Sequence, residues 1–174
     1  MNNIYKKGVV ILDFGSQYTQ LIARRVREQN VYSLILPPNT SLDDISQLDP
    51  AAIILSGGPS SVYEDNAPQF DHEILDIDLP MFGICYGLHL LTHHGGGKVS
   101  STGKGEYGSA GIDIKMNGDL FSGVDSSKVW MSHGDQVLEI PNGWKVSALS
   151  SNGIIAAMTN QEKRRVATQF HPEV

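Results

Sequence analysis

The chain has 174 residues, a length that fits one domain, and its 40% hydrophobic and 18% charged residues exclude a disordered protein. Its net charge of −6 and the absence of an apolar run of about 18 residues predict a protein that neither binds nucleic acid nor spans a membrane. The single cysteine excludes an internal disulfide and the N-terminus lacks the core of a signal peptide, so we expect a cytoplasmic protein.

Alternating strands and helices are predicted for the first half of the chain. Val9–Leu12 is a continuous apolar run rich in β-branched residues, which is typical of a parallel strand covered on both faces. Further strands are predicted at 32–36, 52–55 and 81–84, and helices at 17–29, 42–48, 72–77 and 86–94. This order predicts an α/β fold with an open, mostly parallel sheet and helices on both of its faces.

Short strands without intervening helices are predicted for the second half. They cover 112–114, 129–131, 145–148, 154–158 and 165–169, and Gly, Asn, Ser and Asp separate them. We expect these strands to form a mixed or antiparallel extension of the same sheet. Residues 1–174 are therefore predicted to form one domain.

Charge is unevenly distributed along the chain. Residues 1–30 carry five basic and two acidic side chains, whereas residues 31–97 carry nine acidic side chains and no Lys or Arg. A solvated acidic face is the simpler interpretation of the second segment. A docking surface for a basic partner domain is the alternative.

A candidate nucleophile lies between the last strand and the last helix of the first half. Gly83, Cys85 and Gly87 form the pattern G-x-C-x-G, the cysteine version of the nucleophile elbow. The two glycines permit a tight turn that exposes the thiol at the edge of the sheet, and the N-terminus of the following helix favours the thiolate. We therefore predict that Cys85 is a catalytic nucleophile.

A thiolate nucleophile requires a base, and the base requires a group that orients it. His171 follows a predicted strand, and Glu173 lies two residues further on. In an extended segment these two side chains point to the same side, so Glu173 can hold one imidazole nitrogen while the other faces Cys85. Cys85, His171 and Glu173 are the predicted catalytic residues.

Two consecutive glycines after the third strand are candidates for backbone contacts with a ligand. No Gly-Lys-Ser/Thr follows Gly57 and Gly58, which excludes a P-loop. Beside an elbow, this loop can supply one donor of an oxyanion hole, with the backbone N–H of Tyr86 as the other. His89 and His93 are spaced i, i+4 but lack a third ligand, so we expect no metal site.

These features together resemble the class I (triad) glutamine amidotransferases. The resemblance is carried by five blocks: 11–28 (ILDFGSQYTQLIARRVRE), 54–63 (ILSGGPSSVY), 81–87 (MFGICYG), 129–135 (VWMSHGD) and 169–174 (QFHPEV). The first and fourth blocks are most similar to the amidotransferase domain of the GMP synthetase family. The resemblance implies a flavodoxin-like sheet.

The resemblance also implies an activity and its partners. The chain would hydrolyse glutamine to glutamate and ammonia through a Cys85 thioester, with the oxyanion held by the backbone of Gly58 and Tyr86. Glutamine would contact Gly57, Gly58, His89, Ser132, His133 and Asp135. In the family a separate ATP pyrophosphatase (synthetase) domain or subunit, which this chain does not contain, uses ATP and Mg²⁺ to aminate xanthosine 5′-monophosphate (XMP) to GMP. We expect no cofactor in the present domain.

The sequence departs from the family pattern at two places. The elbow usually continues Gly-Met-Gln, with the Gln holding the substrate, but here it reads Gly87-Leu88-His89. The chain also stops at Val174, where the family's domain continues, so we expect a truncated domain. Two alternatives stay open, an amidotransferase of another synthase and a catalytically silent docking module.

Overall fold

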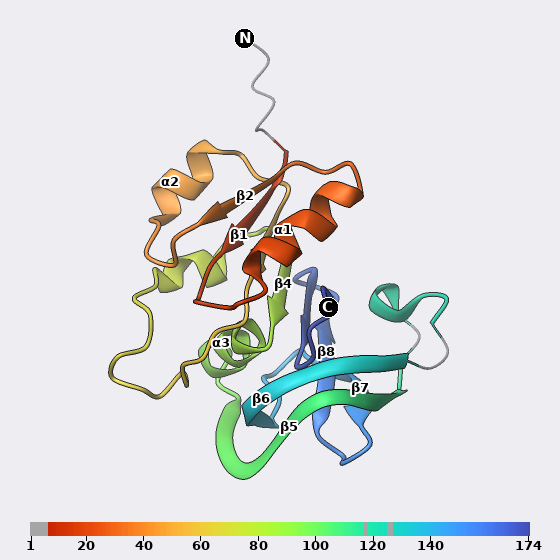
Figure 1. The fold of residues 1–174 in the computed structure, drawn as a ribbon. Coiled ribbons are helices and arrows are strands. Elements are labelled where there is room, and N and C mark those ends of the chain that lie inside the picture. The colour runs from red at the N-terminus through yellow and green to blue at the C-terminus, as the bar shows by residue number, and fades with distance from the viewer. Residues whose placement is uncertain (1–6, 117, 125–126) are drawn as a thin grey trace.

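The computed structural model describes residues 7–116, 118–124 and 127–174, and the strands of these residues form one nine-stranded sheet (Figure 1). The strand order is β2-β1-β3-β4-β9-β8-β7-β5-β6. Neighbouring strands are parallel from β2 to β9 and antiparallel from β9 to β6. The predicted α/β fold, with a parallel sheet and an antiparallel extension, is confirmed.

The parallel half places helices on both faces of the sheet, as predicted. Its strands are β1 (Val9–Leu12), β2 (Ser33–Leu36), β3 (Ala52–Leu55) and β4 (Met81–Ile84), and its helices are α1 (Thr19–Glu28), α2 (Leu42–Gln47), the 3₁₀ helix η1 (His72–Asp76) and α3 (Tyr86–His94). Because side chains alternate along a strand, Val10 and Leu12 pack in a core with α2, η1 and α3, whereas Ile11 packs against α1. Among the described residues, no helix has the length and apolar character needed to cross a membrane.

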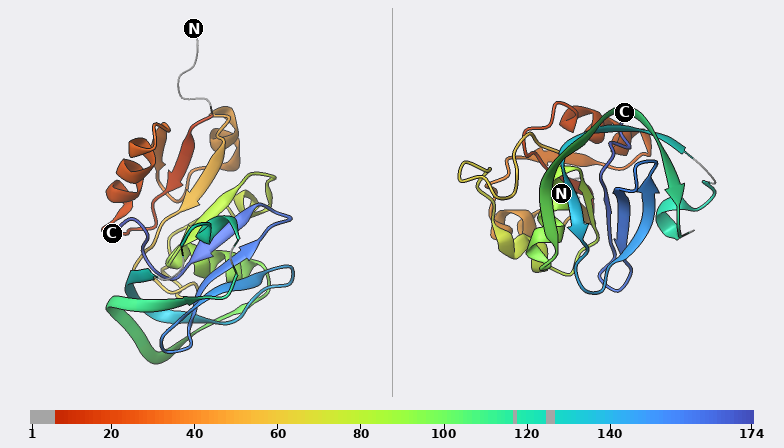
Figure 2. Two further views of the ribbon diagram at one scale, coloured as in Figure 1. Left: turned by 90° about the vertical axis from the view of Figure 1, so that its right-hand side faces the viewer. Right: turned by 90° about the horizontal axis from the view of Figure 1, so that it is seen from below.

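The antiparallel half contains longer strands than the sequence predicts. They are β5 (Lys98–Ile114), β6 (Ser127–Glu139), β7 (Lys145–Ser150) and β8 (Ile155–Asn160), with the 3₁₀ helix η2 (Asp119–Phe121) and the joining strand β9 (Arg165–Thr168). The paired β5 and β6 form a curved ribbon next to the parallel half (Figure 2). The sequence predicts only 112–114 and 129–131 of this ribbon, because much of β5 is Gly and Ser without an apolar alternation.

Helix α1 begins two residues later than predicted, and this has a consequence for the site. The carboxylate of Asp13 accepts hydrogen bonds from the Gly15 backbone N–H at 2.9 Å and from the Thr19 hydroxyl at 2.7 Å. These bonds hold the intervening residues as a loop. Gln17 and Tyr18, predicted to be helical, therefore lie in the loop at the carboxyl end of β1, where ligand sites of open α/β sheets are found.

Candidate active site

Cys85 lies at the predicted sharp turn between β4 and α3. Its backbone has φ = 51°, a left-handed conformation that costs energy for a residue other than glycine. A Cβ on Gly83 would lie 2.6 Å from the carbonyl oxygen of Gly87, and a Cβ on Gly87 would lie 2.4 Å from that of Leu55. The turn therefore requires both glycines of the elbow.

The Cys85 side chain is buried, with 5% of the residue exposed. Its thiol donates to the carbonyl oxygen of Ser132, 3.7 Å from the sulfur, and the amide of Gln169 donates to the sulfur at 3.8 Å. Burial raises the pKa of the thiol to about 12, and the backbone N–H of Tyr86 opposes this shift. The predicted preference for thiolate at the start of α3 is thus outweighed by burial, and ionisation of Cys85 requires a base.

His171 and Glu173 make the predicted contact, with His171 Nδ1 2.8 Å from Glu173 Oε1. Their side chains are only 4% and 2% exposed. The prediction of an extended segment is wrong, because β9 ends at Thr168 and the last residues form a turn. The Thr168 hydroxyl donates to the carbonyl of Phe170. The turn is closed by the Val174 N–H, which donates to the His171 carbonyl at 3.4 Å. The contact is therefore made across a turn and not along a strand.

Helix α1 and the loop before it support this pair from the parallel half. Arg25 Nε donates to the backbone carbonyl of Glu173 at 3.1 Å. The ring of Tyr18 packs edge-on against the imidazole of His171, with centroids 5.1 Å apart. Both ribbon views place the end of the chain beside α1 (Figures 1 and 2). Arg25, a basic residue of α1, therefore makes a contact within the chain.

The glycine loop after β3 lies beside the thiol and the imidazole. A Cβ on Gly57 would lie 3.0 Å from His171 Cε1 and 3.5 Å from Cys85 Cβ, so this glycine keeps the space next to both groups open. A Cβ on Gly58 would lie 2.4 Å from the carbonyl oxygen of Phe14, so the loop also requires its second glycine. The fold therefore brings the loop, the nucleophile and the predicted base together.

Two cavities open onto Cys85 and share Gly58, Pro59 and Ser132 in their walls. The first, here called the His171 cavity, is completed by Gly15, Ser16, Gln17, Tyr18 and His171. The second, here called the Asp135 cavity, is completed by Ser60, Ser61, Glu64, His89, Tyr107, His133, Gly134 and Asp135. The thiol thus lies between a cavity that contains the predicted base and a cavity that contains most of the predicted substrate contacts.

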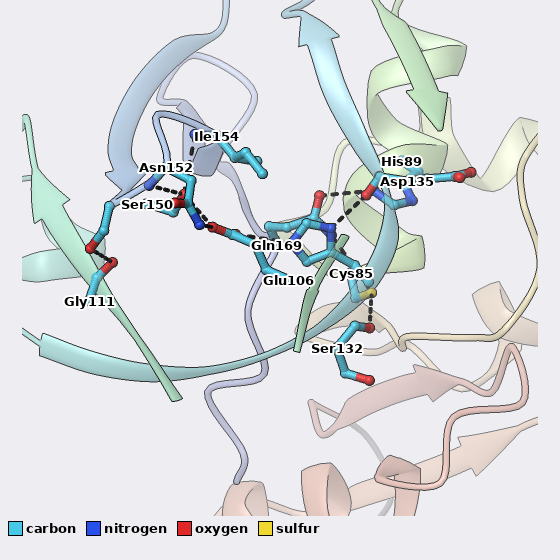
Figure 3. A network of polar contacts seen from close by, with 12 residues as sticks. Cys85, His89, Glu106, Gly111, Ser132, Asp135, Ser150, Asn152, Ile154 and Gln169 are labelled. Atoms are coloured by element: carbon cyan, nitrogen blue, oxygen red, sulfur yellow. Dashed lines mark hydrogen bonds and ion pairs between the residues drawn. The ribbon is translucent and has the colours of Figure 1, made fainter. Parts of the chain in front are cut away.

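A largely buried hydrogen-bond network supports the wall of the Asp135 cavity (Figure 3). His133 Nδ1 donates to the carbonyl of Asp135 at 2.8 Å, and its Nε2 lies 3.2 Å from Glu106 Oε2. Ser150 and Asn152 donate to the other oxygen of Glu106 at 2.8 and 2.7 Å. In contrast, Asp135 Oδ2 is buried without a hydrogen-bond partner among the described residues. This oxygen is an unused acceptor on a residue that lines the cavity.

His89 also lines the Asp135 cavity, although only 3% of the residue is exposed. Its Nε2 lies 3.0 Å from Oε1 of Gln169, and burial lowers the pKa of its imidazole. His93, one turn later on α3, is exposed and packs against the ring of Tyr63. Within the part of the chain that the structure describes, no three His, Cys, Asp or Glu side chains are grouped closely enough to hold a metal ion.

Glu106 and Gln169 are site residues that the sequence pattern does not identify. Their contacts join residues that are far apart in the chain, 46 positions for Asn152 and Glu106 and 80 positions for His89 and Gln169. No spacing rule marks Glu106 within the glycine-rich β5. Gln169 opens the block at 169–174, and this position two residues before His171 is the one signal that points to it.

Known proteins match nearly the whole chain. The family model for "Glutamine amidotransferase class-I" matches residues 10–174. The chain is 51% identical over 167 residues to the GMP synthase (glutamine-hydrolyzing) of Corynebacterium glutamicum and 52% identical over 170 residues to that of Elusimicrobium minutum. These matches cover 95% and 97% of this chain but 32% and 33% of the relatives. The chain thus spans about a third of the length of these relatives.

Solved structures share the fold. The crystal structure of a candidate GMP synthase component from Thermoplasma acidophilum has a TM-score of 0.84 and 25% identity, and the match covers 97% of this chain and 85% of that one. A glutamine amidotransferase from Thermotoga maritima has a TM-score of 0.77 and 20% identity, with 97% and 76% covered. The second likeness supports the fold alone.

Proposed function

The chain belongs to the class I glutamine amidotransferase family, and on that premise we propose that it hydrolyses the side-chain amide of glutamine to glutamate and ammonia. One observation carries the proposal. Cys85 stands on a strained elbow and shares a cavity with His171, whose Nδ1 lies 2.8 Å from the carboxylate of Glu173. A nucleophile, a base and an orienting carboxylate are the three groups that amide hydrolysis through a covalent intermediate requires.

The acylation step uses the free nitrogen of the imidazole. Glu173 occupies Nδ1 of His171, so Nε2 serves Cys85. His171 takes the thiol proton while the sulfur attacks the amide carbon, and the carbonyl oxygen becomes an oxyanion. The backbone N–H groups of Gly58 and Tyr86 are the proposed donors to this oxygen. His171 then gives the proton to the departing nitrogen, so ammonia leaves and a γ-glutamyl thioester remains on Cys85.

Hydrolysis of the thioester uses the same groups. His171 takes a proton from a water molecule, whose oxygen attacks the thioester carbon, and the carbon–sulfur bond then breaks to release glutamate. The proton on His171 returns to the sulfur of Cys85. We assign ammonia release and water entry to the His171 cavity because that cavity contains the base. The remainder of glutamine is then assigned to the Asp135 cavity.

The Asp135 cavity offers a partner for the α-ammonium group of glutamine. Asp135 Oδ2 is buried without a partner among the described residues, and an ammonium group would supply a charge-assisted hydrogen bond. Ser132 and His133 line the same cavity. The Ser132 carbonyl accepts from the Cys85 thiol, so this bond is lost when the sulfur attacks. Gly57 contributes by leaving space between the reacting groups.

The use of the ammonia is inferred from the relatives. They carry the name GMP synthase, and this chain spans about a third of their length. We therefore propose that the ammonia passes to an ATP pyrophosphatase domain or a separate synthetase chain, where it aminates XMP to GMP. On this proposal the present chain needs no cofactor, and ATP and Mg²⁺ are used by the partner.

Glutamate release by the Cys85→Ala variant tests the proposal. We expect the variant to lose hydrolysis while its thermal unfolding stays close to that of the parent. His93→Ala is the matched control, because His93 is exposed on the helix that follows Cys85. Release of glutamate by Cys85→Ala at the parent rate would refute the nucleophile. With the synthetase part and XMP added, Cys85→Ala should still form GMP from ammonia but not from glutamine.

A further inference from the structure

The side chain of Gln169 connects His89 to the thiol of Cys85 (Figure 3). Its Oε1 lies 3.0 Å from His89 Nε2, and its amide nitrogen lies 3.8 Å from Cys85 Sγ. Gln169 is fully buried, and its backbone N–H is used by the carbonyl of Ala156 at 2.8 Å. The side-chain amide therefore has two facing partners, one at each end.

The way this amide faces requires one tautomer of His89. Burial lowers the pKa of His89, so the ring is neutral and carries a single N–H. An amide oxygen only accepts hydrogen bonds, so the 3.0 Å contact requires the N–H to be on Nε2. The NH₂ group of Gln169 then faces the sulfur. The opposite orientation would place the amide oxygen against the sulfur and would oppose a negative charge there.

We propose that His89 is a positioning residue for the nucleophile: its Nε2–H holds Oε1 of Gln169, so that the NH₂ group of Gln169 donates to Cys85 and stabilises the thiolate. The inference rests on the proposed glutaminase function, in which Cys85 must ionise. It gives His89 a task different from direct contact with glutamine. A glutamine side chain at position 89 can donate to Oε1 in the same way, so His89→Gln preserves this task.

Other charged groups near Cys85 are common to the parent and to the variants at positions 89 and 169. Glu173 in the C-terminal turn and Asp135 on β6 both act to raise the pKa of Cys85. His171 lines a cavity with Cys85, and the charges of Asp135 and His133 on β6 act in opposite directions on the pKa of His89. A change in thiol ionisation common to variants at positions 89 and 169 is therefore assigned to the Gln169 amide.

The test is the pH dependence of Cys85 alkylation by iodoacetamide, a small reagent that needs no glutamine site. The variants are His89→Leu, Gln169→Met, the double variant and His89→Gln, with His93→Leu as the control on the same helix. In His89→Leu and Gln169→Met we expect the alkylation rate, compared well below the thiol pKa at about pH 8 to 9, to fall about tenfold. The alkylation rate of the double variant should fall no further than that of either single variant. His89→Gln and His93→Leu should keep the parent profile.

Glutamine kinetics of His89→Leu separate this task from substrate binding. A lower kcat with an unchanged KM supports the proposal, since the thiolate is used in the chemical step. An unchanged alkylation profile together with a raised KM would overturn it and make His89 a substrate contact. Additive shifts in the double variant would also overturn it. Alkylation measures the ionisation of the Cys85 thiol even in a chain that hydrolyses no glutamine. A chain without glutaminase activity but with the expected alkylation rates would therefore contradict the proposed function and not the role of His89.

Discussion

The parallel and antiparallel halves of the sheet contribute different parts of the candidate site. The parallel half carries Cys85 on an elbow whose glycines leave no room for a side chain. The antiparallel half carries His133, which contacts Glu106, 27 positions away in the chain, and donates to the backbone carbonyl of Asp135. His171 and Glu173 follow β9, the strand at which the two halves meet. The nucleophile is thus positioned by tight backbone packing, whereas the pocket depends on side-chain hydrogen bonds.

This difference predicts different consequences for substitutions. A change at the elbow should affect stability and nucleophile together, because backbone packing sets its geometry. Changes among the polar residues of the second half should mainly affect proton transfer or substrate binding, because hydrogen bonds set their geometry. Substitutions in both halves can test this division.

The largest effect is expected for Glu173→Gln. The variant keeps the size of the side chain but loses the charge that stabilises a protonated His171, and its NH₂ group can turn the imidazole to the wrong tautomer. We expect kcat to fall by about 10⁴-fold, as for the equivalent carboxylate of serine triads, with little change in KM. Steady-state glutaminase kinetics measure this. A loss below about tenfold would remove Glu173 from the catalytic residues.

A large loss of stability is expected for Gly87→Ala. The added Cβ would lie 2.4 Å from the backbone carbonyl of Leu55, which cannot move without shifting β3. We expect the free energy of unfolding to fall by about 3 kcal/mol, measured by urea denaturation, with loss of Cys85 reactivity. Gly118→Ala is the control, because a Cβ there meets no described atom within 4 Å. Equal stability of the two variants would show that the elbow is not sterically constrained.

The same division explains which parts the sequence can predict. The elbow is predictable because Gly83, Cys85 and Gly87 lie within five residues and their spacing alone requires a tight turn. The contact between His171 and Glu173 is predicted for a wrong reason, since two residues can meet across a turn as well as along a strand. Gln169 meets His89 only after β9 has paired between β4 and β8, and no local pattern encodes that pairing.

An intermediate effect, on substrate binding, is expected for Asp135→Asn. The substitution keeps an acceptor but removes the charge proposed to hold the α-ammonium group of glutamine. We expect KM to rise about 10- to 100-fold, which corresponds to the loss of one hydrogen bond to a charged group. We expect kcat to change little. Glu64→Gln is the control, since Glu64 lines the same cavity but is exposed. An equal rise in KM for both variants would indicate a general effect of charge.

The smallest effect is expected for Arg25→Met, which tests whether the two halves are coupled. Arg25 Nε holds the backbone carbonyl of Glu173 at 3.1 Å, but its side chain is 53% exposed, so water can partly replace the bond. We expect kcat to fall about two- to fivefold. Arg24→Met is a close control, because Arg24 pairs with the same Glu28 and, among the described residues, only Arg25 of the two bonds to Glu173. A decrease in the Arg25 variant alone would mean that α1 helps to position the base. Equal rates in both variants would mean that the turn holds His171 and Glu173 without help from the parallel half.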